Sequence, residues 1–307
     1  LGLVLSTPLT VCLVVLGRHI PQFEVFDILF GDEPVLAPHA RLYQRLLAGD
    51  AIETTFRAEE ALETAYLVEY YRDVGIPALL IAQNDYGRGV LTADQEDRLA
   101  RVGLQMVADL QEVVAEELGE EPEDSGAEAA AEGPIGDQRL EGAGYRVICI
   151  GGRSKLDDVS AAMLAQAMEA EGAETVSLPH TDLAPTRFRA LDTQGKDCLV
   201  LSFLDPSPSR ASLLHIRRIK RAVPHLRVGV VIWQMPAGVE DGTDAARRMA
   251  PVPEAKLQEA LDIGADFAVT GIEAAYGAAF VDEAPKAVPV VAKRQARAAG
   301  RRKVAAA

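Results

Sequence analysis

Two short polar segments hold the residues best suited to ligand binding. The first, GGRSKLDD at 151–158, contains Gly151, Gly152, Arg153 and Ser154 directly after an apolar run. Two glycines let a ligand approach the backbone, and the Arg153 guanidinium suits an anionic group. The segment matches neither the GxGxxG dinucleotide fingerprint nor a phosphate-binding P-loop. The pattern therefore favours a structural loop, with a ligand-lining loop, for which these four residues are the candidates, as the alternative.

The second polar segment, SFLDPSPS at 202–209, contributes Ser202, Leu204 and Asp205 as candidate ligand-binding residues. Asp205 precedes a proline, which favours a turn at this point. Within the first segment, Asp157 and Asp158 are interpreted as acids at a helix N-terminus, where the helix dipole stabilises negative charge. These two acids are therefore not expected to act as catalysts.

Catalytic and metal-binding patterns do not emerge from the sequence. It shows no Ser/His/Asp order, no paired carboxylates and no cluster of metal ligands. His180 follows an apolar run and is interpreted as a loop residue. The three cysteines, Cys12, Cys149 and Cys198, lie apart in apolar runs, which favours reduced thiols over disulfides or zinc. We therefore expect no enzymatic activity, no cofactor and no metal.

Length and charge set further limits. The chain has 307 residues, 31 Lys+Arg against 46 Asp+Glu, and a formal net charge of −15. This length fits about two domains of roughly 100–200 residues each. Binding to nucleic acid needs clustered lysines and arginines that neutralise phosphates. The acidic balance therefore predicts that the protein does not bind nucleic acid.

The elements that position the two polar segments lie in residues 145–284. Short β-branched apolar runs alternate there with helical patterns, which predicts parallel strands with helices on both faces. Five such units favour an α/β, flavodoxin-like sheet in the order 2-1-3-4-5. Ligands bind such sheets beyond the strand carboxyl ends, between strands one and three. The expected strands are 145–152, 174–179, 197–205, 226–233 and 266–270.

Residues 37–115 have helical periodicity and are expected to form a four-helix bundle that caps the sheet. Pro77 should kink or split the third helix after Gly75. Thr92 is expected to cap a long last helix that ends near Leu118. Residues 116–144 have a strongly negative net charge and are rich in Gly and Ala, which predicts a flexible linker. The basic tail at 285–307 is interpreted as a disordered end or as a contact with an anionic membrane surface.

The first segment, residues 1–36, begins with an uncharged apolar run, and the first charged residue is Arg18. A spanning helix needs about 20 apolar residues, so this run is slightly short. It is interpreted as the end of a transmembrane helix, with Arg18 and His19 marking the cytoplasmic side. A buried core helix or strand is the alternative.

The helical cap followed by this sheet resembles the cobalamin-binding module of methionine synthase and of light-sensing MerR-type regulators. LYQRLLAGD, LVEYYRDVGIPAL, GRG and SFL (202–204) carry the likeness. The family's D-x-H-x-x-G motif falls on Gly152, Ser154 and Asp157, so the resemblance implies a module without its axial histidine. IWQMP replaces the family's glycine pair, with Trp233 filling space, and Tyr86 takes the place of the cap tryptophan.

The whole chain is similar to the C-terminal region of the autoinducer-2 exporter family of PerM-like permeases. PLTVCLVVLGRH, VICIGGRSKLDD and LSFLDPSPS carry this likeness. It implies a regulatory region on the cytoplasmic side of a bacterial inner-membrane permease, with a small ligand or partner and a homo-oligomer as one possible assembly. The alternatives are a soluble sensor of cobalamin or a nucleotide-like molecule, and an enzyme that uses Arg153, Ser202 and Asp205.

Overall fold

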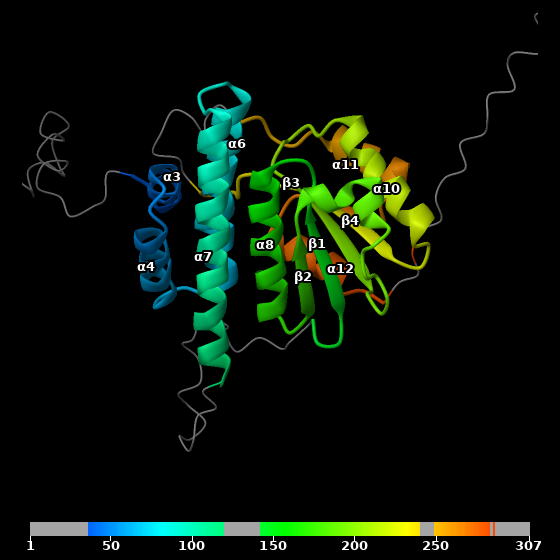
Figure 1. Ribbon diagram of the computed structural model, residues 1–307, viewed down its shortest axis with the longest axis horizontal. Helices are drawn as coiled ribbons and strands as arrows, with labels where there is room; N and C mark the ends of the chain where they lie inside the picture. Colours follow the sequence, from blue (N-terminus) through cyan, green and yellow to red (C-terminus); the bar gives the residue numbers. More distant parts are fainter. Residues whose placement is uncertain (1–35, 120–141, 240–248, 283–284, 286–307) are drawn as a thin grey trace, which may run out of the picture.

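The computed structural model describes residues 36–119, 142–239, 249–282 and 285. Five parallel strands form one sheet in the order β2-β1-β3-β4-β5 (Figure 1). The predicted fold class, α/β with this flavodoxin-like order, is therefore confirmed. The strands are β1 (Arg146–Gly151), β2 (Glu174–Leu178), β3 (Cys198–Phe203), β4 (Arg227–Ile232) and β5 (Phe267–Val269).

Helices cover both faces of the sheet, as a doubly wound fold requires. One apolar cluster joins α8 (Lys155–Ala170) and α12 (Ile272–Ala279) to one face of the strands. A second cluster joins α10 (Arg210–Ala222) and α11 (Glu254–Ile263) to the other face. Two short helical segments, η3 (His180–Leu183) and α9 (Pro185–Phe188), connect β2 to β3.

Burial follows position in the sheet. Nearly every residue of β1, β3 and β4 is buried, as their continuous apolar runs predict. The expectation of burial on both faces is wrong for β2, where no residue is fully buried and Val176 remains 39% exposed. The reason is topological: β2 is an edge strand, and it pairs only with β1.

Four helical rods precede the sheet, as predicted. They are α3 (Pro38–Ala48), α4 (Ala51–Leu62), a composite third rod, and α7 (Ala93–Gly119). The third rod comprises α5 (Leu67–Tyr70), a π-helical turn η2 (Tyr71–Gly75) and α6 (Ile76–Gly87). The interruption ends at Gly75, as Pro77 predicted. Pro77 then lies in the first turn of α6, where a proline gives up no intrahelical hydrogen bond.

Local signals set the helix ends. Gly49 ends α3 with a φ of 86°, a left-handed conformation that glycine adopts without strain. The Asp50 side chain then accepts a hydrogen bond from the Glu53 amide at 3.1 Å and starts α4. Thr92 Oγ1 accepts from the Gln95 amide at 3.3 Å, so the predicted cap of the long last helix is confirmed.

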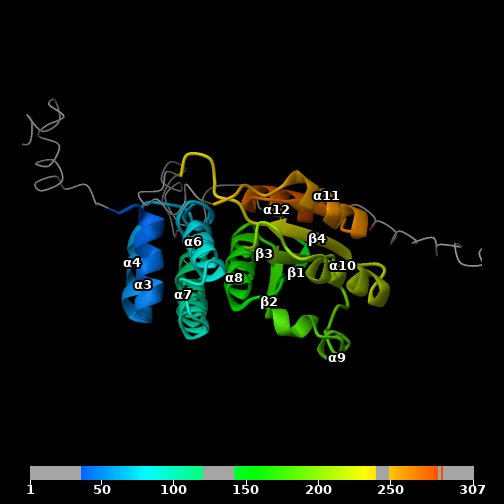
Figure 2. The same cartoon turned by 90° about the horizontal axis from the view of Figure 1, so that it is seen from above.

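The bundle packs against α8, which lies between α7 and the sheet (Figure 2). A Cβ atom on Gly103 of α7 would lie 2.9 Å from Val159, so glycine permits this close helix approach. The buried Gln166 of α8 accepts a hydrogen bond from the Tyr71 hydroxyl and donates to the Val107 carbonyl at 3.0 Å. The bundle and the sheet therefore share one packed core.

Three predicted segments lie wholly or largely outside the described residues: the membrane helix within 1–36, the linker at 116–144 and the tail at 285–307. Among the described helices, none is long and apolar enough to cross a membrane. Cys149 and Cys198 are free and buried, in agreement with the expected reduced thiols.

Candidate functional site

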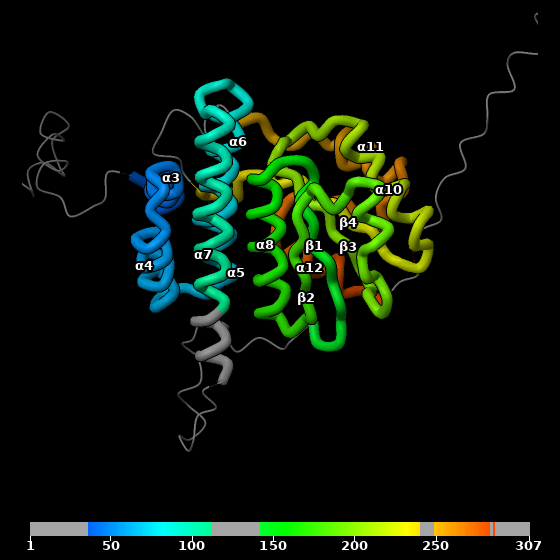
Figure 3. The backbone as a smooth tube through the Cα atoms, viewed as in Figure 1, coloured from blue at the N-terminus to red at the C-terminus, as the bar shows by residue number. Residues whose placement is uncertain are grey.

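The carboxyl ends of the strands and the turn between α6 and α7 lie at the same end of the molecule (Figure 3). Gly151 at the end of β1 is in register with Ser202 near the end of β3, so the two predicted polar segments are adjacent. A cavity of about 460 Å³ lies between these loops and the bundle. It is lined by Gln83, Tyr86, Gly87, Glu96, Asp97, Arg153, Ser154, Lys155, Asp157, His180, Phe203, Asp205 and Pro208.

A second cavity of about 340 Å³ adjoins the first and shares Gln83, Gly87 and Asp205 with it. Its wall continues to Trp233 and Met235, beyond the end of β4. We call the two cavities together the cap–sheet cleft. Its position beyond the carboxyl ends of the strands is the one at which parallel sheets bind ligands.

Asp157 ties the two polar loops together. Its carboxylate accepts hydrogen bonds from the amides of Leu204 at 2.8 Å, Arg153 at 2.9 Å and Ser154 at 3.0 Å. Burial raises the pKa of Asp157 to about 6, and these hydrogen bonds oppose the rise. Asp157 and Ser154 also form a capping box at the start of α8, as the interpretation of Asp157 as a helix N-terminal acid predicts.

Asp158 holds His180 by two hydrogen bonds. One carboxylate oxygen accepts from the His180 amide at 2.6 Å, and the other lies 2.8 Å from ring Nδ1. The hydrogen bond to Asp158 raises the pKa of His180 above its ordinary value. With Nδ1 engaged, Nε2 is the ring nitrogen left for the cavity. His180 lies in the connecting segment after β2, where it was expected, and it also lines the cleft.

The bundle contributes an acidic group to the same cavity. Glu96 of α7 is 7% exposed, and burial raises its pKa, although a hydrogen bond from Tyr86 opposes the rise. In turn, the negative charge of Glu96 raises the pKa of Tyr86. Lys155 at the start of α8 lies 2.5 Å from Asp97, so an ion pair bridges the bundle and the sheet across the cleft.

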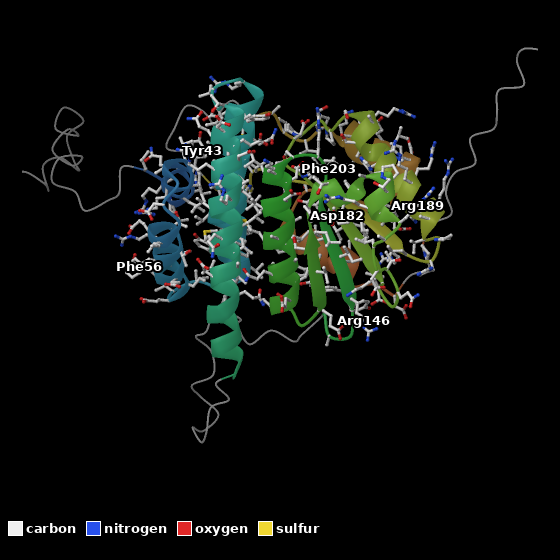
Figure 4. The ribbon with its side chains drawn as sticks, viewed as in Figure 1. Tyr43, Phe56, Arg146, Asp182, Arg189 and Phe203 are labelled. Atoms are coloured by element: carbon white, nitrogen blue, oxygen red, sulfur yellow. The ribbon has the colours of Figure 1, made fainter. Side chains whose placement is uncertain are left out.

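The two predicted glycines have a packing role. A Cβ atom on Gly151 would lie 2.0 Å from Asp158 Oδ1, and one on Gly152 would lie 2.1 Å from the Phe203 ring. Both glycines are buried, and neither lines the cavities. The expectation that a ligand approaches the backbone at these glycines is therefore corrected. The space beside them is occupied by the side chains of Asp158 and Phe203, and Phe203 is labelled in Figure 4.

Ser202 is also turned away from the cleft. It is 0% exposed, and its hydroxyl accepts a hydrogen bond from Trp233 Nε1 at 2.7 Å and lies 2.6 Å from the Ser160 hydroxyl. Ligand binding by Ser202 is therefore corrected to a structural role. Leu204 is 0% exposed at the cleft floor. Trp233 is 2% exposed, as a side chain that fills space should be.

The remaining predicted site residues line the cleft. Arg153 is exposed, Ser154 is half-buried, and Tyr86 is 37% exposed. Asp205 lies between the two cavities and accepts a hydrogen bond from the Ser207 amide at 2.9 Å, which makes the predicted turn. Sequence reasoning missed Gln83, Glu96, Asp97, Lys155 and His180. Two of them had a usable signal: Lys155 lies within the first polar segment, and His180 follows the second strand at the carboxyl edge.

Within the described ranges, no group of three or more His, Cys, Asp or Glu side chains is arranged to hold a metal ion. No model of a known protein family matches the chain. No curated protein matches it either.

Proposed function

We propose that the bundle and the sheet form a ligand-sensing module that regulates a bacterial inner-membrane permease from the cytoplasmic side. One observation carries the sensing role. Glu96 and Tyr86 of the bundle line the same cavity as Arg153 and His180 of the sheet module. A ligand that contacts both sides changes how firmly the bundle and the sheet hold together, which is how a binding event becomes a regulatory signal.

The cleft suits a small polar ligand with both donors and acceptors. Its two cavities, about 460 and 340 Å³, have the size of ordinary metabolite sites. Arg153 and His180 donate to an anionic or carbonyl oxygen, whereas Glu96 and Asp205 accept from amino or hydroxyl groups. Holding a ligand by these groups involves no chemical step, so we propose that the cleft binds its ligand without catalysis.

Intrinsic fluorescence tests the sensing role. The chain contains one tryptophan, and it is Trp233 at the cleft wall. Pools of amino acids, nucleotides and sugar phosphates should include a compound that shifts Trp233 emission in a saturable manner. The shift should be lost in His180→Ala and Glu96→Gln and retained in Arg189→Gln, which lies on the far side of the sheet (Figure 4). Equal responses of all variants would contradict the proposal.

Membrane attachment is tested separately, because it rests on the sequence of residues 1–36. The intact gene product should sediment with membranes and be released by detergent, but not by high salt. Full recovery in the soluble fraction would contradict a permease and leave only the sensing role.

The alternative function, a soluble cobalamin sensor, has one observation in its favour. His180 brings an imidazole into the cleft on the sheet side, whereas Ser154, at the expected histidine position, caps α8. We nevertheless expect no imidazole–cobalt bond, because the cavities are small and Trp233 fills the interior beside them. Hydroxocobalamin should leave the visible spectrum unchanged. Nitrogen hyperfine splitting in the electron paramagnetic resonance spectrum of added cob(II)alamin, abolished in His180→Ala, would favour the alternative.

A further inference from the structure

A cavity of about 490 Å³ lies inside the helical bundle, on its side away from the sheet. Its lining residues belong to α3, α4 and the α5–η2 segment. Among the described elements, α3 and α4 form the outermost layer of the bundle (Figures 1 and 2). It shares no lining residue with the cap–sheet cleft. We call it the arginine cavity, after Arg41, Arg45 and Arg57 in its wall.

Two of these arginines have no counter-ion within the described part of the chain. Arg41 and Arg45 are four residues apart on α3, so their side chains lie on one helix face. Among the described residues, neither guanidinium takes part in an ion pair or a hydrogen bond. Like charges at this spacing destabilise a helix unless an anion lies between them. In a chain with a net charge of −15, carboxylates that could have paired with them are abundant.

Arg57, by contrast, is fully engaged. Its guanidinium lies 2.8 Å from Glu53 and 2.7 Å from Glu60, both on α4. Glu60, the one acid in the cavity wall, is therefore neutralised by its neighbour. Arg41 and Arg45 therefore give the wall a positive charge that no carboxylate among the described residues balances.

One buried polar atom in the wall lacks a partner among the described residues. Arg41 Nε is buried and has no hydrogen-bond acceptor within the described part of the chain. Tyr70 is 5% exposed, lines the cavity, and its hydroxyl makes no hydrogen bond to a described residue. Burial raises the pKa of Tyr70 above its ordinary value, so the hydroxyl keeps its proton for donation. A buried donor such as Arg41 Nε is normally satisfied in native proteins.

We propose that the arginine cavity binds a small organic oxyanion, a phosphate ester or a carboxylate. Arg41 and Arg45 hold its charged group, and the Tyr70 hydroxyl donates a third hydrogen bond. Guanidinium groups bind such groups in a planar, two-point manner. Leu42, Ala61 and Val74 in the same wall form an apolar surface for the organic part of the ligand.

Isothermal titration of the intact chain with AMP, citrate and inorganic pyrophosphate tests this site. At least one of AMP and citrate should bind with a 1:1 stoichiometry, and the affinity should fall with added salt. Arg41→Gln/Arg45→Gln should weaken binding at least about tenfold. Arg189→Gln removes the same kind of charge from an exposed position on the sheet module and should leave the affinity unchanged.

A conservative variant separates recognition from folding. Arg41→Lys/Arg45→Lys keeps both charges and loses the planar donor groups, so it should fold normally and still bind more weakly. Absence of binding for all three anions overturns the proposal. Binding that all the variants retain equally also overturns it, because the anion then lies elsewhere. Neither result bears on the cap–sheet cleft, which contains none of these residues.

Discussion

Asp158 holds His180 through both the backbone amide, at 2.6 Å, and ring Nδ1, at 2.8 Å. Asp158, in the first turn of α8, therefore fixes the segment after β2 against the cleft. Gly151 permits this arrangement, since a Cβ atom at its position would overlap the Asp158 carboxylate. Gly151, Asp158 and His180 thus depend on one another at the carboxyl edge of the sheet, although nothing in the sequence pattern links them.

Titration by nuclear magnetic resonance should show this coupling. We expect the pKa of His180 above its ordinary value of about 6.5, because the protonated ring is stabilised by Asp158. Asp158→Asn should lower it. His215 provides an internal contrast, since burial lowers its pKa in the same molecule. Matching pKa values for the two histidines would contradict the pairing.

Folding stability follows from the same shift. Because the folded state raises the pKa of His180, this residue stabilises the fold fully below pH of about 6.5, the ordinary unfolded value. The contribution is lost as the pH rises through the folded pKa. His180→Gln should therefore flatten the fall in unfolding free energy as the pH rises above about 6.5, measured by urea denaturation.

Gly152 should be intolerant of a side chain. In Gly152→Ala the new Cβ would lie 2.1 Å from the Phe203 ring, so we expect a loss of about 2 kcal/mol of unfolding free energy. Gly277 in α12 is the matched control, because no atom lies within 4 Å of its added Cβ. Gly277→Ala should stabilise the protein by about 0.5 kcal/mol, since alanine favours helix. Changes in unfolding free energy of the same sign for both variants, measured by urea denaturation, would contradict this explanation by packing.

The sequence was sufficient for the fold because the decisive signals are local. The apolar runs marked all five strands, and Pro77 and Thr92 marked an interruption and a helix start. The interruption and the helix start depend on hydrogen bonding within one segment, and the buried strands appear as continuous apolar runs, so the residue pattern reflects both directly. Edge exposure of β2 was missed because burial depends on which strands are neighbours in space.

The site was harder to predict because its residues come from separate elements. Ser202 has the type of a ligand-binding residue, and only its contacts with Trp233 and Ser160 show that it is structural. Glu96 belongs to the helix before the sheet and lies fifty residues before Arg146, the first residue of β1, so no spacing in the sequence places it opposite His180. Long-range packing decides both cases.

Asp157 should be essential for the cleft floor. Removing its carboxylate in Asp157→Ala leaves the buried Leu204 amide and two loop amides without their acceptor. We expect a loss of about 2 kcal/mol in unfolding free energy. Asp262→Ala, which removes an exposed acid that bonds only Gln258 among the described residues, should change stability by less than about 0.5 kcal/mol. Similar losses for both variants in urea denaturation would show that the bonds of Asp157 are not structural.

Two lysine–aspartate pairs of similar length should differ in strength because they differ in burial. Lys220 lies 2.6 Å from Asp266 with side chains 1% and 4% exposed. Lys155 lies 2.5 Å from Asp97 with side chains 52% and 43% exposed. Lys220→Met leaves a buried carboxylate without its cation and should cost about 3 kcal/mol of unfolding free energy.

Lys155→Met removes a pair that water already screens, so its cost should stay below about 1 kcal/mol. Urea denaturation of the two variants at one ionic strength compares the pairs directly. Added salt should weaken the Lys155 pair more than the Lys220 pair, because counter-ions reach only the exposed one. Equal costs would mean that the distance between the charges, rather than the solvent around them, sets the strength of both pairs.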